Sequence, residues 1–343
     1  MRAPYVFLMI VAFLVMYMGI QKDDDEHKTE EKNKTEYNEV AKEVAYIGEE
    51  KPIHAFIGES EDMIIEQFGQ PTRKDVSAYD YVWWVYYKES ENYIQFGLHE
   101  GKVVTAFALG DNLSLFPFEI GSALQEGLLE KMIDERIEVL VADELIELKI
   151  DQNGSDNYLM NLGNAWAQLY VDEFTDKLMA IRYMDNETLV KQRQFDMVYR
   201  GSLLSPQPLS TEQIKEVEDG NERQVFEITN ILRNRYNLPS LLWDEEIAKT
   251  AVHHSKDMKI NDYFSHTSPT NGDLAKRLMM ENIVYLSAGE NIAAKYTDAP
   301  AVVIGWLNSE SHRESLLHSD FTHLGVGVYE QYYTQNFIQT ALD

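Results

Sequence analysis

Three histidines and one glutamate in the last third of the chain carry side chains that can bind a divalent metal ion or transfer protons near neutral pH. They are His254, His266, Glu290 and His312. Their sequence blocks, in order, are AVHHSKDM, YFSHTSP, AGENIA and GWLNSESHRESLL. These blocks are too far apart in the sequence to form one local motif, so only the fold can bring the four side chains together.

The first of these blocks is predicted to lie on a helix. In WDEEIAKTAVHHSKDM, Asp244 is placed to cap the helix, and Glu245 and Glu246 follow in its first turn. The helical period puts His254 on the inward face with the apolar residues, whereas His253 points elsewhere. An inward histidine is more often a core residue hydrogen-bonded to the backbone than a ligand. The preceding segment NERQVFEITNILRNRYNLP also predicts a helix.

The blocks and their order resemble the CAP superfamily, also called the SCP-like family, which includes cysteine-rich secretory proteins, insect venom antigens and plant pathogenesis-related proteins. The resemblance runs from about Asn221 to Phe337. It implies an α-β-α sandwich in which helices cover both faces of a sheet. It also implies that the histidine of the YFSH segment and the glutamate of the GEN segment, here His266 and Glu290, face a common cleft. The bacterial W-x-x-S-x-x-HR pattern adds His312.

One position departs from the animal and plant pattern. Those relatives carry a second cleft histidine in a GHYTQ-like strand, whereas this chain reads YEQYYTQNF, with Tyr332 at that place. A metal site of the family type would therefore need His312 or His254 as a substitute. The final stretch also predicts two antiparallel strands, in which Gly325 and Gly327 indicate a close backbone approach.

The cleft set allows three kinds of chemistry. As metal ligands, His266, His312 and His254 suit a zinc-like divalent ion with an open position. Without metal, Glu290 is a candidate general base and a histidine, His266 or His312, the acid. The third interpretation is a buried hydrogen-bond network that only holds the cleft together. Neither a nucleophile elbow nor an HExxH helix occurs in the sequence.

The region 53–201 predicts a duplicated α+β domain. Its second unit, AWAQLYVDEFTDKLMAIRYMD, echoes YIQFGLHEGKVVTAFALGD in the first, which aligns Gln95 with Gln168. This region resembles the domain that precedes the CAP module in some secreted proteins of spore-forming Gram-positive bacteria. Its strip of Trp83, Trp84, Tyr86 and Tyr87 alternates as in a strand, which favours core packing over ligand stacking.

Within residues 1–20, Arg2 precedes an apolar run from Ala3 to Ile20, and the acidic sequence QKDDDEHKTEEK follows it. This pattern predicts an uncleaved signal anchor, with a cleaved signal peptide as the alternative. The positive end predicts that the rest of the chain lies outside the cytoplasm. Residues 21–52 predict an acidic flexible stalk, 202–220 a linker with two prolines, and 221–343 the CAP/SCP-like domain.

The amino-acid composition argues against some classes of binding partner and of chemistry. The formal net charge is −28, from 30 basic and 58 acidic side chains, which argues against a nucleic-acid partner. There is no cysteine, so neither disulfides nor thiolate chemistry are available.

Together these observations predict an extracytoplasmic protein, anchored at the outer side of the cytoplasmic membrane or secreted. Its cleft is expected to bind a small or extended cell-envelope ligand, namely a lipid, a glycan or a peptide. The alternative is a metal-assisted hydrolase of peptide or cell-wall bonds that uses the same cleft. A third possibility is an interaction protein that works through its N-terminal repeats.

Overall fold

The computed structural model describes residues 51–88, 92–110, 113–124, 136–150 and 158–340, all within one unit of the chain. The predicted anchor and almost all of the predicted stalk lie outside these residues. Within the described ranges, no helix is both long and apolar enough to cross a membrane. Helices and strands are mixed along the chain, which confirms the predicted α+β class.

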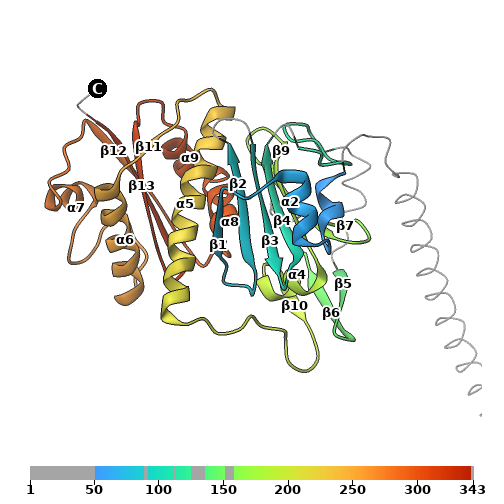
Figure 1. The fold of residues 1–343 in the computed structure, drawn as a ribbon. Coiled ribbons are helices and arrows are strands. Elements are labelled where there is room, and N and C mark those ends of the chain that lie inside the picture. Colours follow the sequence, from blue (N-terminus) through green and yellow to red (C-terminus); the bar gives the residue numbers. More distant parts are fainter. Residues whose placement is uncertain (1–50, 89–91, 111–112, 125–135, 151–157, 341–343) are drawn as a thin grey trace, which may run out of the picture. The chain divides into compact units, whose positions relative to one another are not determined.

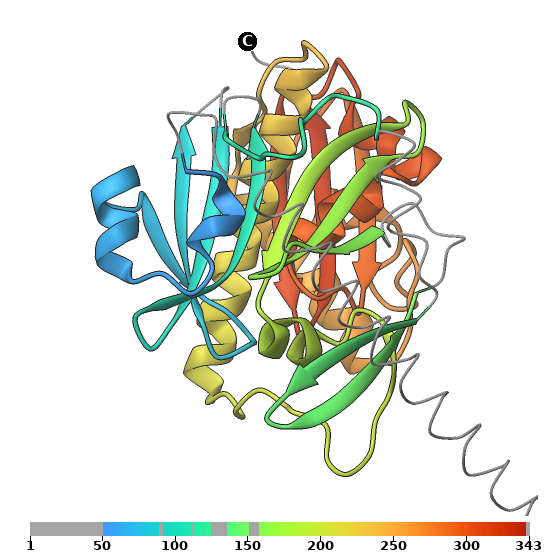
Figure 2. The ribbon, with the colours of Figure 1, turned by 90° about the vertical axis from the view of Figure 1, so that its right-hand side faces the viewer.

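The N-terminal module is built on an antiparallel sheet with the strand order β1-β2-β3-β4-β9-β8-β7. Its strands are β1 (Arg73–Val76), β2 (Val82–Lys88), β3 (Asn92–His99), β4 (Lys102–Gly110), β7 (Tyr158–Asn161), β8 (Trp166–Asp172) and β9 (Lys177–Met184). The short helices η1 (Ile53–Phe56) and α2 (Glu61–Phe68) pack on the face that bears Trp84 and Phe96. Figure 2 shows this sheet in front of the C-terminal elements.

The two hairpins of the predicted repeat are β3–β4 and β8–β9. They meet at the middle of this sheet, where β4 pairs with β9. Gln95 pairs with Phe107, Phe107 with Arg182, and Arg182 with Gln168, so the two aligned glutamines lie in one cross-strand row. The β5–β6 hairpin departs from the symmetry of the repeat, because it belongs to a separate sheet with the strand order β10-β6-β5. That sheet contains β5 (Arg136–Val141), β6 (Glu144–Lys149) and β10 (Asp196–Val198), and α4 (Asn186–Gln192) precedes its last strand.

Helix α5 (Thr211–Arg235) starts ten residues before the predicted domain, so the expected linker 202–220 is wrong from Thr211 onward. A capping box fixes the start: Ser210 N donates to Gln213 Oε1 (2.9 Å), and Gln213 N donates to Ser210 Oγ (3.3 Å). Gly220 lies inside the helix, where a Cβ would stand 2.9 Å from the Cβ of Asp75. The glycine therefore allows α5 to approach β1 and does not mark a boundary.

The C-terminal module is the predicted sandwich, built on a sheet with the order β11-β13-β14-β12 (Figure 1). Its strands are β11 (Leu242–Trp243), β12 (Ser287–Ala294), β13 (His323–Tyr329) and β14 (Tyr332–Gln339). One face packs against α6 (Glu245–Ile260) and α7 (Leu274–Met280). The other face packs against α5, α8 (Ala299–Leu307) and α9 (Glu310–Leu316).

Two glycines of β13 allow α6 to lie close to the sheet. A Cβ on Gly325 or Gly327 would overlap the backbone of α6 near Ala248 or Val252. The predicted close approach is confirmed, and the partner is the helix. Asp244 caps α6 as predicted, since its side chain accepts hydrogen bonds from Glu246 N and Ile247 N at 3.0 Å.

Both modules contribute to one hydrophobic core. It includes Trp83 and Phe107 from the larger sheet, Val225 from α5, and Trp306 and Phe337 from the C-terminal module. Helix α5 lies between the two sheets, with contacts to β1 on one side and β13 on the other (Figure 1). The predicted core role of the aromatic strip is confirmed for Trp83 and Trp84, which are both buried.

Ion pairs cross the same boundary. The fully buried guanidinium of Arg182 lies 2.6 Å from Asp298 at the start of α8. Arg313 of α9 forms a bidentate ion pair with Asp172 of β8: Nη1 donates to Oδ1 at 3.0 Å and Nη2 donates to Oδ2 at 2.9 Å. Because these pairs are buried and their partners come from different modules, the N-terminal module helps to position α8 and α9.

Candidate functional site

Glu290 lies in the middle of β12, the strand at one edge of the smaller sheet. Asn336 of β14 is directly opposite, and strand alternation puts both side chains on the face covered by α6 and α7. The Glu290 side chain is only 3% exposed. A carboxylate at this depth needs charged or hydrogen-bonding partners, and the neighbouring elements supply them.

Two of the other three predicted side chains lie close to this carboxylate. His266 Nδ1 lies 2.9 Å from Glu290 Oε1, and His254 Nε2 lies 4.0 Å from the same oxygen. The His266 side chain is 57% exposed, whereas His254 is buried. One imidazole therefore faces solvent above the carboxylate, and the other is buried beneath it.

His254 fits the expectation of an inward histidine bound to the backbone. Its Nε2 lies 3.1 Å from the carbonyl oxygen of Ser265, and a carbonyl only accepts, so Nε2 carries a proton. Burial lowers the pKa of His254 below the ordinary value, against the opposing charge of Glu290. The ring is therefore neutral at pH 7. Its Nδ1 is buried and has no hydrogen-bond partner among the described residues.

Arg277 of α7 is a site residue that the sequence analysis missed. Its Nη2 forms an ion pair with Glu290 Oε2, and its Nη1 donates to the carbonyl oxygens of His266 and Gly272 at 2.9 Å. The side chain is buried, so this guanidinium neutralises the carboxylate inside the fold. A sequence signal existed, because Arg277 shares the apolar face of a short helix with Leu274 and Leu278.

The loop that carries His266 is fixed by Asp257 on α6. The Asp257 carboxylate accepts hydrogen bonds from Ser268 Oγ (2.6 Å), Asn261 Nδ2 (2.7 Å) and the Tyr263 hydroxyl. Burial alone would raise the pKa of Asp257, but these hydrogen bonds, with Ser268 the strongest, lower it below the ordinary value. The charged carboxylate thus ties both sides of the loop to α6.

His312 approaches the site from α9, on the other side of β12. Its Nδ1 lies 2.8 Å from Ser309 Oγ, and its carbonyl oxygen accepts a hydrogen bond from Asn291 Nδ2 at 3.1 Å. Burial, and then the charge of His266, lowers the pKa of His312. No hydrogen bond or ion pair among the described residues joins it to Glu290, His254 or His266.

The predicted metal set does not fit this arrangement. Across the described part of the chain, no three His, Cys, Asp or Glu side chains are grouped so as to hold a metal ion. One oxygen of Glu290 is paired with Arg277, whose positive charge opposes a divalent cation, and His254 Nε2 is bound to a carbonyl. A zinc site of His254, His266 and His312 would require these contacts to break.

Tyr332, which stands where animal and plant relatives have a cleft histidine, lies at the start of β14 opposite Ala294. The residue of β14 that lies opposite Glu290 is Asn336, four residues after Tyr332. Four residues of strand span about 13 Å. The phenol therefore does not replace an imidazole at the carboxylate.

Comparison with known proteins agrees with this fold. Residues 226–341 match the cysteine-rich secretory protein family, and residues 57–195 match the CAP-associated N-terminal domain. The chain is 39% identical to the Bacillus subtilis protein named "Uncharacterized membrane protein YlbC", over 99% of this chain and 98% of that one. The chain belongs to the cysteine-rich secretory protein (CAP) family and carries the CAP-associated N-terminal domain.

Two solved structures resemble the whole described unit. One is an extracellular protein containing an SCP domain from Bacillus anthracis, with 41% identity and a TM-score of 0.81, covering 86% of this chain and 98% of that one. The other is a cysteine-rich secretory protein from Staphylococcus aureus, with 20% identity and a TM-score of 0.74, covering 85% and 94%. The second shares the fold.

Proposed function

We propose that this protein works outside the cytoplasm and that its cleft at β12 binds a cell-envelope ligand such as a lipid, a glycan or a peptide. The names of its relatives, a membrane protein and an extracellular protein, support that location. One observation carries the binding role: the half-exposed imidazole of His266 is held by a buried carboxylate. A ring fixed in this way offers its outer nitrogen to a ligand at little entropic cost.

The pairing of the Glu290 carboxylate favours a binding role over a catalytic role. Its Oε2 is paired with Arg277 and its Oε1 with His266, so the carboxylate is neutralised and is a poor general base. Ser309 contacts His312, but no carboxylate in the described residues orients that histidine as a catalytic triad requires. The alternative, a metal-assisted hydrolase, would first have to displace Arg277.

The test is saturation binding of residues 50–343 to a Gram-positive cell-envelope fraction, followed by native mass spectrometry of the recovered protein. His266→Ala should weaken binding about tenfold, as expected for the loss of one hydrogen bond to a buried group. His253→Ala is the matched control, because that side chain is 58% exposed on the same module but lies away from Glu290.

The outcomes separate the two functions. An organic adduct on the protein that is lost in His266→Ala and kept in His253→Ala supports the binding role. A divalent-metal mass that is lost in His266→Ala and Glu290→Ala supports the hydrolase. Binding that survives both of these substitutions would place the ligand elsewhere on the protein.

A further inference from the structure

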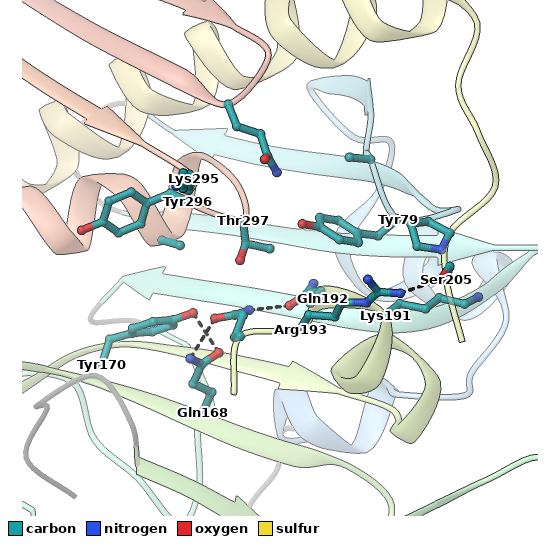
Figure 3. Close-up of a pocket in the computed structure, with 15 residues that line it drawn as sticks. Tyr79, Gln168, Tyr170, Lys191, Gln192, Arg193, Ser205, Lys295, Tyr296 and Thr297 are labelled. Atoms are coloured by element: carbon teal, nitrogen blue, oxygen red, sulfur yellow. Dashed lines mark hydrogen bonds between the residues drawn. The ribbon is translucent and has the colours of Figure 1, made fainter. Parts of the chain in front are cut away.

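A second cavity lies between the two modules, away from the carboxylate of Glu290. Its volume is about 760 Å³, within the range of small-molecule sites. Figure 3 shows its walls, which come from the loop at Tyr79, from β8, from the end of α4, and from the β12–α8 connection at Lys295 to Thr297. Because both modules supply walls, the cavity exists only in the assembled unit.

The floor of this cavity is a chain of amides. Tyr170 donates its hydroxyl proton to Gln168 (3.0 Å), Gln168 donates to Gln194 (3.0 Å), and Gln194 donates to Gln192 (2.5 Å). Gln168 and Gln192 are only 3% and 4% exposed. Buried Arg182 also donates to Gln192 at 3.1 Å. These contacts hold the amides in place before any ligand arrives.

The charged residues that line the cavity are all basic. Of the residues that line it, three are basic, Lys191, Arg193 and Lys295, and none is acidic, although the chain has 58 acidic side chains. Lys191 is paired with Asp80 at 3.1 Å. Arg193 contacts only the hydroxyl of Ser205 (2.6 Å), and neither it nor Lys295 forms an ion pair within the described residues. Two uncompensated cations therefore face the cavity.

Tyrosine rings complete the walls. Tyr79, Tyr170 and Tyr296 line the cavity and lie around it in Figure 3. Burial, with the charge of Asp298, raises the pKa of Tyr79 to about 12, so its hydroxyl keeps its proton. Aromatic faces cover apolar C–H surface, and amides and hydroxyls hydrogen-bond to ligand hydroxyls. A sugar ring presents both kinds of surface.

We propose that this cavity is a second binding site, for a saccharide that carries an anionic group. Arg193 and Lys295 hold the phosphate or carboxylate, Gln194 holds ring hydroxyls, and Tyr79 covers the ring. This site is independent of the cleft at β12, so its failure would leave the proposed function untouched.

The test is calorimetric titration of residues 50–343 with glucose 6-phosphate and with glucuronic acid, and with glucose as the neutral control. At least one anionic probe should bind saturably and more tightly at low salt, and glucose should not. The double variant Arg193→Gln, Lys295→Gln should weaken binding by about tenfold or more. Arg200→Gln removes an exposed charge of the N-terminal module outside the cavity and should change nothing.

The two probes identify the anionic group of the ligand. Tighter binding of glucose 6-phosphate indicates a phosphate, and tighter binding of glucuronic acid indicates a carboxylate. His266→Ala must leave this binding unchanged. Three results would overturn the proposal: no saturation by either anionic probe, equal binding of glucose, or affinity that the double variant retains while its thermal stability matches the parent protein.

Discussion

The Glu290 site on β12 and the cavity between the modules both contain buried polar groups, but their charges are compensated differently. In the cleft, the carboxylate of Glu290 is neutralised by Arg277 within the fold. In the cavity, Arg193 and Lys295 have no acidic partner among the described residues. The difference indicates that the cleft offers hydrogen bonds from a neutral set of groups, whereas the cavity needs an anion from outside.

The largest expected effect tests whether Arg277 is what makes the buried carboxylate tolerable. Arg277→Leu should destabilise residues 50–343 by about 3–5 kcal/mol, because it removes the cation that pairs with the buried carboxylate and leaves only the hydrogen bond from His266. Urea denaturation measures the change. Lys276→Leu, an exposed neighbour on α7, is the control. A loss under about 1 kcal/mol for Arg277→Leu would contradict internal neutralisation.

A buried carboxylate without such a partner should behave in the opposite way. Glu222 of α5 accepts a hydrogen bond from Val328 N (3.0 Å) but forms no ion pair within the described ranges, and burial raises its pKa to about 7. A folded-state pKa above the unfolded value of about 4.5 means that stability falls as the pH rises from about 4.5 to 7.

Glu222→Gln should therefore stabilise the protein by about 1–3 kcal/mol at pH 8 and have little effect at pH 4. Paired urea titrations at the two pH values measure this difference. The exposed Glu245→Gln on α6 is the control and should show no pH-dependent gain. A destabilised Glu222→Gln protein at pH 8 would remove the contrast with Glu290.

The smallest expected effect tests how close His312 is to the cleft. Electrostatic interaction with His266 contributes to the lowered pKa of His312, after burial. His266→Ala should raise the pKa of His312 in an NMR titration, whereas His253→Ala should not. Identical titration curves in all three proteins would separate His312 from the cleft.

Much of the C-terminal module could be predicted because its signals are local. Asp244 precedes the apolar face of α6, Gly325 and Gly327 alternate on β13, and the YFSH and GEN segments carry His266 and Glu290 to one place. The register of β12 against β14 then decides which residue faces the carboxylate. That residue is Asn336, and no local pattern in the sequence identified it.

The start of α5 and the walls of the cavity depend on tertiary contacts, which a local sequence pattern does not predict. The capping box of Ser210 and Gln213 is visible in the sequence, but the nearby prolines and Gly220 favoured a linker. Only the contact with Asp75 explains that glycine. The cavity between the modules is lined by residues from six separate segments, so neither Arg193 nor Lys295 stands out along the chain.

The shared core has a consequence for how the protein responds to proteases. Residues 202–209 form a largely accessible strap without helix or strand between β10 and α5. Cleavage there would cut the chain between the two modules, yet Trp83, Phe107 and Val225 would stay packed in one core. A protease that cuts this segment would therefore produce a nicked protein that stays assembled, and would not release a free CAP domain.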